Sequence, residues 1–344
     1  MSIRRFLTTT ALAALASCLA GAPAQAFTFQ NIINPADPTF NQALGINNSG
    51  LITGYFGSGN IGFPNQGYTV PSTALTSFTS TNFPGSVQTQ VTGLNNTGTL
   101  VGFWAPSNLG PGNDVNHGWY QLSGGAFVTV DNPLTTGTPA VNQLLGVNNS
   151  NVAVGFYNDA AGNSHGYTYN IGANTFTPVD FGLFSTTAAG INNAGDIVGF
   201  YTDAGGVTHG FLDQAGTFTT LDAPGSTFTQ LLGVNNKGLI VGTDMDAAGN
   251  MHGVIFNDLT NTWTVSDAFG QTSNFTTFNG VNDMGQIVGF YTQDFGAGNT
   301  IGLLASSPAP EAGKGVLGLA LLVLAIAMGR RLARVDSAPG DATL

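Results

Sequence analysis

Short runs of alternating apolar and polar residues, separated by turns rich in glycine and asparagine, fill the middle of this chain. One motif, Gly-apolar-Asn-Asn/Asp-x-x-x-apolar-x-Gly, occurs six times at intervals of 43 to 53 residues. Its copies start at Gly45, Gly93, Gly146, Gly190, Gly233 and Gly280. A repeat of this length is the usual sequence sign of a solenoid or a propeller.

Two further signatures follow each copy of the motif. The second signature is His-Gly-aromatic, which begins at His117, His165 and His209. Divergent copies begin at His252, Gln66 and Ile301. The third places an aromatic residue four positions before Asp or Asn, as in Phe78–Asn82, Phe127–Asp131, Phe176–Asp180, Phe218–Asp222 and Trp263–Asp267.

Each repeat therefore predicts four short strands, which in the fourth copy lie near 187–192, 196–201, 209–212 and 217–222. Asn-Asn-x-Gly between the first two strands favours a tight hairpin, because Asn and Gly accept positive φ at low cost. No stretch of the middle has a helical period, and glycine at this density would weaken helices. The fold class is all-β, a six-bladed β-propeller of four-stranded blades.

The number of strands also predicts how the ring closes. The third signature follows only five of the six repeats, and its missing copy matches Phe27-Thr28-Phe29-Gln30-Asn31 at the other end of the chain. We therefore expect the N-terminal strand to complete the last blade and remove its open edge.

The amino-acid composition says more about which partners the protein can bind than about its fold. Of 344 residues 49 are Gly, and only 7% are charged, against a typical fraction of about 25%. Residues 27–310 contain fifteen Asp, no Glu, no Arg and a single base, Lys237. Binding to nucleic acid depends on clustered Lys and Arg, so a nucleic-acid partner is excluded.

The N-terminus is typical of export. Residues 1–26 form a predicted signal peptide, with Arg4 and Arg5 before an apolar stretch and a small-x-small cleavage site ending at Ala26, so that the mature chain starts at Phe27. The alternative is a lipobox-like segment that ends at Cys18, which would be lipidated. Cys18 is the only cysteine, so no intrachain disulfide forms.

The C-terminus carries a short apolar run from Val316 to Met328, followed by Arg330, Arg331 and Arg334. With Pro310 and Glu311 before it, this segment resembles the PEP-CTERM sorting signal of Gram-negative bacteria. It departs from that pattern at Ala312, where a second Pro is expected. The resemblance implies that an exosortase-type membrane enzyme processes the tail. The alternative is a plain membrane anchor, although thirteen residues are few for a span of about twenty.

The repeats themselves resemble the HAF-repeat family of extracellular bacterial proteins, whose His-Ala-Phe triplet corresponds to His-Gly-Phe at 209–211 and its relatives. The resemblance covers about residues 27–305. It implies an extracellular location and a repeat architecture, and the family has no agreed chemistry.

Repetition argues that the conspicuous polar residues are structural. The repeated asparagines (Asn47, Asn95, Asn148, Asn192, Asn235 and Asn282) belong to the hairpins. The four histidines occupy one equivalent position in successive blades, too far from the axis to share a metal ion, and we expect each to bond a neighbouring loop. No catalytic motif is present, and we predict neither a catalytic residue nor a bound metal or cofactor.

Two weaker alternatives concern ligands. Oxygen-rich segments at 158–163, 203–206 and 244–246 could bind Ca²⁺. None of them has the full spacing of a calcium-binding loop, and the simpler interpretation is that they form Asx-type hairpin turns. Paired aromatics such as Phe200-Tyr201 could stack on sugars, whereas strand alternation puts one of each pair between blades.

The expected organisation is a signal peptide (1–26), a six-repeat propeller (27–305), a linker (306–314), a sorting or membrane segment (315–334) and a tail (335–344). The predicted protein is exported to the Gram-negative cell envelope or matrix and is not an enzyme. It would bind an extracellular polysaccharide or envelope protein, and the alternative is a glycan-acting hydrolase or lyase that uses Asp on one face.

Overall fold

The computed structural model describes residues 27–306, which form six four-stranded antiparallel sheets. Blade 1 contains β2 (Asn41–Ile46), β3 (Leu51–Phe56), β4 (Gln66–Pro71) and β5 (Thr79–Ser80). Blade 2 contains β6 (Gln88–Leu94), β7 (Leu100–Ala105), β8 (His117–Gln121) and β9 (Phe127–Val130). Blade 3 contains β10 (Asn142–Val147), β11 (Val152–Asn158), β12 (Ser164–Asn170) and β13 (Thr175–Pro178).

Blade 4 contains β14 (Ser185–Ile191), β15 (Ile197–Thr202), β16 (Thr208–Gln214) and β17 (Thr217–Thr220). Blade 5 contains β18 (Phe228–Val234), β19 (Leu239–Met245), β20 (Met251–Asn257) and β21 (Thr262–Ser266). Blade 6 contains β22 (Phe275–Val281), β23 (Gln286–Thr292), β24 (Thr300–Ser306) and β1 (Thr28–Ile32). Two 3₁₀ turns lie at η1 (Ala268–Gly270) and η2 (Asp294–Gly296). The predicted six-bladed propeller of four-stranded blades is confirmed.

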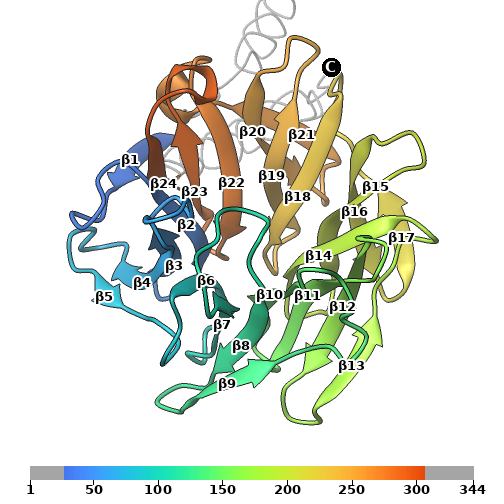
Figure 1. Ribbon diagram of the computed structural model, residues 1–344. Helices are drawn as coiled ribbons and strands as arrows, with labels where there is room; N and C mark the ends of the chain where they lie inside the picture. The colour runs from blue at the N-terminus through green and yellow to red at the C-terminus, as the bar shows by residue number, and fades with distance from the viewer. Residues whose placement is uncertain (1–26, 307–344) are drawn as a thin grey trace, which may run out of the picture. The chain divides into compact units, whose positions relative to one another are not determined.

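The ring closes through the N-terminal strand, as predicted. Strand β1 pairs antiparallel with β24, with Asn31 opposite Leu303 and Ile32 opposite Gly302. In Figure 1 the blue strand β1 lies beside the dark orange β24, and the first and last blades are neighbours. The strand begins one residue later than the match at 27–31 indicated.

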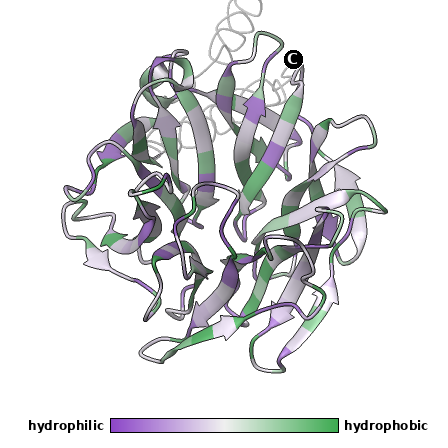
Figure 2. Cartoon of the chain, in the orientation of Figure 1, coloured by the Kyte–Doolittle hydropathy of each residue, from purple (hydrophilic) through white to green (hydrophobic). Residues whose placement is uncertain are grey.

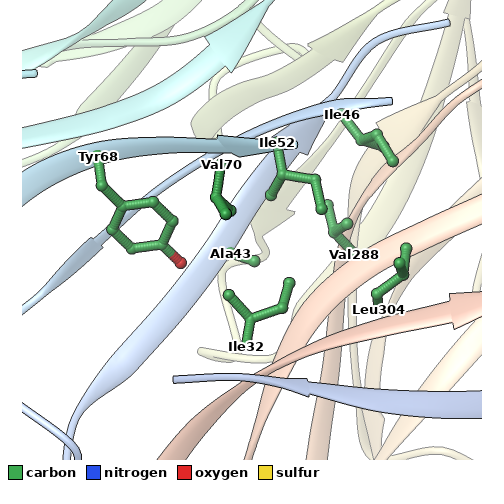
Figure 3. Packing of buried hydrophobic residues seen from close by; sticks show 8 residues of the cluster. All are labelled: Ile32, Ala43, Ile46, Ile52, Tyr68, Val70, Val288 and Leu304. Carbon is green, nitrogen blue, oxygen red and sulfur yellow. The ribbon is translucent and has the colours of Figure 1, made fainter. Parts of the chain in front are cut away.

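The hydrophobic core is divided among the blade interfaces, because each strand alternates between the two faces of its sheet. Figure 2 shows strands banded with hydrophobic and hydrophilic residues. Figure 3 shows the cluster at the seam, where Ile32 of β1 and Leu304 of β24 meet Ile52 and Tyr68 of blade 1. Ile32 is fully buried. Equivalent clusters join blades 2 and 3, 3 and 4, and 4 and 5.

The first glycine of the motif is required where the innermost strands come closest. A Cβ at Gly93 would lie 3.0 Å from the Cα of Gly146, and a Cβ at Gly280 would lie 3.0 Å from the Cα of Gly45. Each of the six glycines meets the next in this way around the ring. A side chain at these positions would push neighbouring blades apart.

The six innermost strands surround a central channel. The repeated asparagines close one end of this channel, and we call that end the Asn end. In every hairpin the first asparagine accepts hydrogen bonds from two N–H groups of its own turn and donates one to a carbonyl of the next blade; Asn95, for example, donates to Asn148 O at 2.8 Å. The six donors, in ring order, are Asn47, Asn95, Asn148, Asn192, Asn235 and Asn282. Asn282 donates back to Asn47 O, so the hydrogen bonds form a closed circle.

A second circle lies beside the first. The backbone N–H of Asn48 donates to Asn96 Oδ1 of the next blade. The equivalent residue of each later blade makes the same contact, and the backbone N–H of Asp283 in the last blade donates to Asn48 Oδ1. Five members of this circle are Asn and one is Asp283. The cavity inside it is only about 70 Å³, so the Asn end of the channel is nearly shut.

Candidate functional site

The channel is open at its other end, which we call the mouth. The innermost strands begin here, and their first residues line a cavity of about 920 Å³. Phenylalanines form much of its wall, namely Phe156, Phe200, Phe275, Phe290 and Phe295. Amide side chains supply hydrogen-bonding groups beside them, namely Gln42, Gln143, Gln230 and Asn279. No residue that lines this cavity is charged.

The paired aromatics divide between two environments, which the sequence left open. Tyr201 stacks on Phe181 of the connection between blades 3 and 4, with ring centroids 4.1 Å apart. Phe200, its neighbour in the chain, points to the other face of β15 and lines the mouth. One member of the pair therefore packs beside the preceding blade, as strand alternation predicts, and the other is available to a ligand.

A side cavity of about 270 Å³ adjoins the mouth between blades 1 and 2. Gln143 lines both cavities. The long loops at 57–65 and 106–116 border the side cavity, and Asn108 Nδ2 joins them by donating to Asn60 O at 3.1 Å. Its one charged lining residue, Asp114, accepts hydrogen bonds from Gln88 Nε2 at 2.9 Å and Ser107 Oγ at 2.6 Å.

The four histidines lie around the mouth side, each at the start of its blade's third strand. Each ring bonds through Nδ1 to the aspartate that follows its own fourth strand: Asp131, Asp180, Asp222 and Asp267. In blades 3, 4 and 5 the other nitrogen, Nε2, lies 3.4–3.5 Å from a carboxylate of the loop before the third strand: Asp159, Asp203 and Asp246. Each histidine therefore bonds a neighbouring loop.

These contacts shift the titration of the groups involved. The hydrogen bond that His209 donates to the carboxylate of Asp222 raises the pKa of His209 above its usual value. Burial alone would lower the pKa of His252, but the hydrogen bonds and negative charges of the neighbouring aspartates, Asp267 above all, together outweigh burial and raise it. Donation from the Asn250 side chain lowers the pKa of Asp246 to about 2, and donation from Asn163 does the same for Asp159.

The three oxygen-rich segments are turns stabilised by their own aspartates. Oδ1 of Asp203 accepts the N–H groups of Gly205 and Val207, both at 2.8 Å, and Asp159 and Asp246 act likewise. Two residues assigned to these loops lie elsewhere: Asn158 ends β11, and Asp244 lies within β19. Within residues 27–306 no group of three or more His, Cys, Asp or Glu side chains is arranged to hold a metal ion.

Asp244, which the sequence placed in an oxygen-rich loop, is instead a buried residue of β19. It stands where the other blades carry an aromatic residue such as Tyr201 or Tyr291, and only 5% of its surface is exposed. Its Oδ1 has no hydrogen-bond partner among the described residues. Burial raises its pKa to about 6. The sequence contains a sign of this unusual position, because the fifth repeat has Val-Gly-Thr-Asp where other repeats have Val-Gly followed by two aromatic residues.

Replacing Asp244 by Asn is expected to stabilise the protein at neutral pH. The folded-state pKa lies above the unfolded value, so the carboxyl group favours folding at low pH, and this contribution is lost as pH rises through about 6. Asp244→Asn should therefore raise stability by about 1–2 kcal/mol near pH 7.5 and change it little near pH 3.5, below the unfolded pKa of about 3.9. Thermal melts at both pH values measure the difference.

Asp258→Asn, at an exposed loop position near the Asn end, is the matched control and should have no such pH-dependent effect. An Asp244→Asn gain that is equal at both pH values would contradict the assignment of the effect to a buried charge.

The remaining predicted residues lie outside the described part of the chain: Cys18, Ala26, Pro310 and Glu311. Phe27 is the first described residue and precedes β1 directly. Within residues 27–306 no helix is long and apolar enough to span a membrane.

The fold and the mouth define a six-bladed β-propeller whose channel is closed by asparagines at one end and opens into an uncharged, aromatic-lined cavity at the other. Comparisons with protein-family models and with curated protein sequences give no match. Among solved structures, a protein of unknown function from Dyadobacter fermentans aligns with 83% of this chain and with 100% of its own length, at 13% identity and a TM-score of 0.51. That similarity shows the fold alone.

Two other solved structures align with this chain at lower TM-scores. The fungal lectin from Aleuria aurantia, described as a six-bladed β-propeller with a novel mode of fucose recognition, has 9% identity and a TM-score of 0.43, with 65% of this chain and 76% of the lectin covered. A PL25 ulvan lyase has 10% identity and a TM-score of 0.44, with 78% of each chain covered. Neither alignment bears on what this chain binds.

Proposed function

We propose that the chain is an exported, non-enzymatic binding module of the cell surface or extracellular matrix, and that its mouth holds an extracellular glycan. The observation that carries this proposal is the lining of the mouth. Phenylalanine faces stack on the apolar faces of sugar rings, while glutamine and asparagine side chains match hydroxyl groups without requiring charge.

Export and sorting are part of the same proposal. They rest on the signal-like residues 1–26 and on the PEP-CTERM-like segment after Pro310, which would be processed by an exosortase-type enzyme. A matrix or envelope location would place the propeller beside polysaccharides and envelope proteins.

An enzymatic role as a glycan hydrolase or lyase is the alternative. Such chemistry usually needs a pair of carboxylates or an activated nucleophile next to the substrate. Asp114 is the only charged residue among those that line the mouth and the side cavity, and its oxygens are engaged by Gln88, Ser107 and the N–H of Leu109. This arrangement favours binding over turnover.

A glycan array probed with the purified full chain tests the proposal. Phe200→Ala combined with Phe290→Ala removes two stacking faces, and we expect affinity for the best glycan to fall at least about tenfold, as for aromatic residues at the centre of an interface. The matched control is Leu259→Ala, an exposed apolar residue in a β20–β21 loop at the Asn end, which should bind like the wild type.

Glycan turnover that is lost in Asp114→Asn would contradict a purely binding role. Binding to no glycan, or binding that is equal in the mouth variant and in the wild type, would contradict the site.

A further inference from the structure

The channel narrows in steps between the mouth and the Asn end. Directly below the mouth cavity lies a space of about 200 Å³, which we call the inner chamber. It is continuous with the mouth, because Gln42, Gln143 and Leu145 line both. The next space, at the six motif glycines, is about 80 Å³, and the space at the Asn end is about 70 Å³. Each of these two holds only a few water molecules at about 30 Å³ each. For a ligand as large as a sugar ring, the channel therefore ends at the inner chamber.

Two rings of side chains from the innermost strands line this part of the channel. The lower ring contains the residue before each motif glycine, and all six members line the inner chamber: Leu44, Thr92, Leu145, Ala189, Leu232 and Asn279. The upper ring contains the residue two positions earlier in each strand: Gln42, Gln90, Gln143, Thr187, Gln230 and Thr277. No residue that lines the inner chamber is charged.

Two glutamines of the upper ring are held by the walls behind them. Gln90 Nε2 donates to Asn65 Oδ1 at 2.8 Å, and Gln143 Nε2 donates to Asn116 Oδ1 at 2.7 Å. Each of these bonds engages the nitrogen of the amide, so the oxygen is the atom left to accept a hydrogen bond from a ligand. The inner chamber therefore suits a ligand that supplies hydrogen-bond donors, such as the hydroxyl groups of a sugar.

Asn279 breaks the pattern of the lower ring. The equivalent residue is leucine in blades 1, 3 and 5, and the hydroxyl group of Thr92 is satisfied because it donates to Leu144 O at 2.7 Å. Asn279 Oδ1 is buried and has no hydrogen-bond partner among the described residues. An unpaired buried carbonyl group costs folding free energy, so the stability of the fold gives no reason for asparagine here. A polar group in one blade only, at the floor of a cavity, is expected where a ligand supplies the missing donor.

We propose that the mouth recognises the end of a neutral glycan chain and holds its last sugar in the inner chamber, where a donor of that sugar bonds Asn279 Oδ1. This inference rests on the proposed glycan-binding function and adds which part of the glycan is bound. A channel with a closed end admits a chain end, whereas an internal segment must leave in two directions and can lie only across the phenylalanines above. The leucines of the lower ring would contact the apolar face of the last sugar. A charged sugar would lose its hydration there without compensation.

Pairs of array glycans that differ at one end test the proposal. Each pair contains a neutral oligosaccharide printed through its reducing end and the same oligosaccharide extended by one further neutral sugar at its free end. For a shorter member that the full chain binds, we expect affinity to fall at least about tenfold on extension, because the added sugar takes the place of the preferred one in the inner chamber. A protein that binds an internal segment would bind both members of the pair equally.

Two variants connect end recognition with the inner chamber. Asn279→Leu and Ala189→Leu each introduce the residue that blades 1, 3 and 5 already have, so both should fold. Asn279→Leu removes the acceptor with little change of volume, and affinity for the bound shorter glycan should fall about tenfold without a loss of Tm. Ala189→Leu narrows the inner chamber and should weaken binding to a similar extent. Leu259→Ala at the Asn end is again the control and should bind like the wild type.

Each other outcome is decisive. Equal binding of the shorter and the extended glycans overturns end recognition and leaves the glycan-binding function standing, because the combined Phe200→Ala and Phe290→Ala variant would still lose affinity. Unchanged affinity in Asn279→Leu or in Ala189→Leu also overturns the inference, because it places the glycan outside the inner chamber. An array on which no glycan is bound would overturn the glycan-binding function itself.

Discussion

A chain that begins at Asn34 instead of Phe27 is expected to aggregate or to melt far below one that begins at Phe27. The deletion removes β1, whose five residues pair with β24, and it leaves β24 as an open, hydrophobic edge. It also removes Ile32, which is fully buried in the cluster of Figure 3 between the first and last blades. Lost burial and lost backbone pairing together should cost on the order of 5 kcal/mol.

Two neighbouring residues provide a sharper version of this experiment. Ile32→Ala should cost about 2–5 kcal/mol, as for other buried isoleucines, whereas Ile33→Ala, 38% exposed in the native chain, should be nearly neutral. Ending the chain after Ser306 should cost little, because β24 ends there. Differential scanning calorimetry and size-exclusion chromatography measure these effects. If the chains that begin at Phe27 and at Asn34 have equal melting temperatures and are both monomeric, the seam does not depend on β1.

Gly102→Ala is a point substitution with a large expected effect. The register between β6 and β7 shifts around Thr92, so that Val91 opposes Gly102. A Cβ on Gly102 would overlap the backbone oxygen of Gln90 and lie 3.0 Å from Cε2 of the fully buried Trp119. A backbone oxygen in a sheet cannot move aside, so we expect a loss of about 3 kcal/mol or more, which lowers Tm by roughly 6–12 °C.

Gly172→Ala is the matched control for Gly102→Ala. Its Cβ would meet only the Oδ1 of Asn170, at an ordinary 3.6 Å, so the change should be neutral or slightly stabilising. A Gly102→Ala protein that melts with the wild type would mean that the shifted register in blade 2 is wrong.

The architecture could be predicted from the sequence because it is repeated. Six copies of a motif at near-constant spacing fix the number of blades, and alternation with turn residues fixes four strands in each. The missing sixth copy of the third signature located the closing strand at 27–31, within one residue of β1. These inferences needed only local patterns, because each blade is built mainly from contacts close in sequence. The shift of one residue reflects the weak definition of strand ends by local sequence.

The site depended on tertiary structure. Which aromatic of each pair faces the channel, and how residues such as Gln42 and Phe290 come together at one mouth, is decided by ring closure, which brings positions almost 250 residues apart into one wall. The burial of Asp244 has the same origin, because the residue that replaces the aromatic side chain is buried only when the preceding blade packs beside it. The sequence by itself determined the units and their number, since these follow from local pattern. Only the closed ring decided the cavity and the circles of asparagine hydrogen bonds, since each exists only when six blades surround one axis.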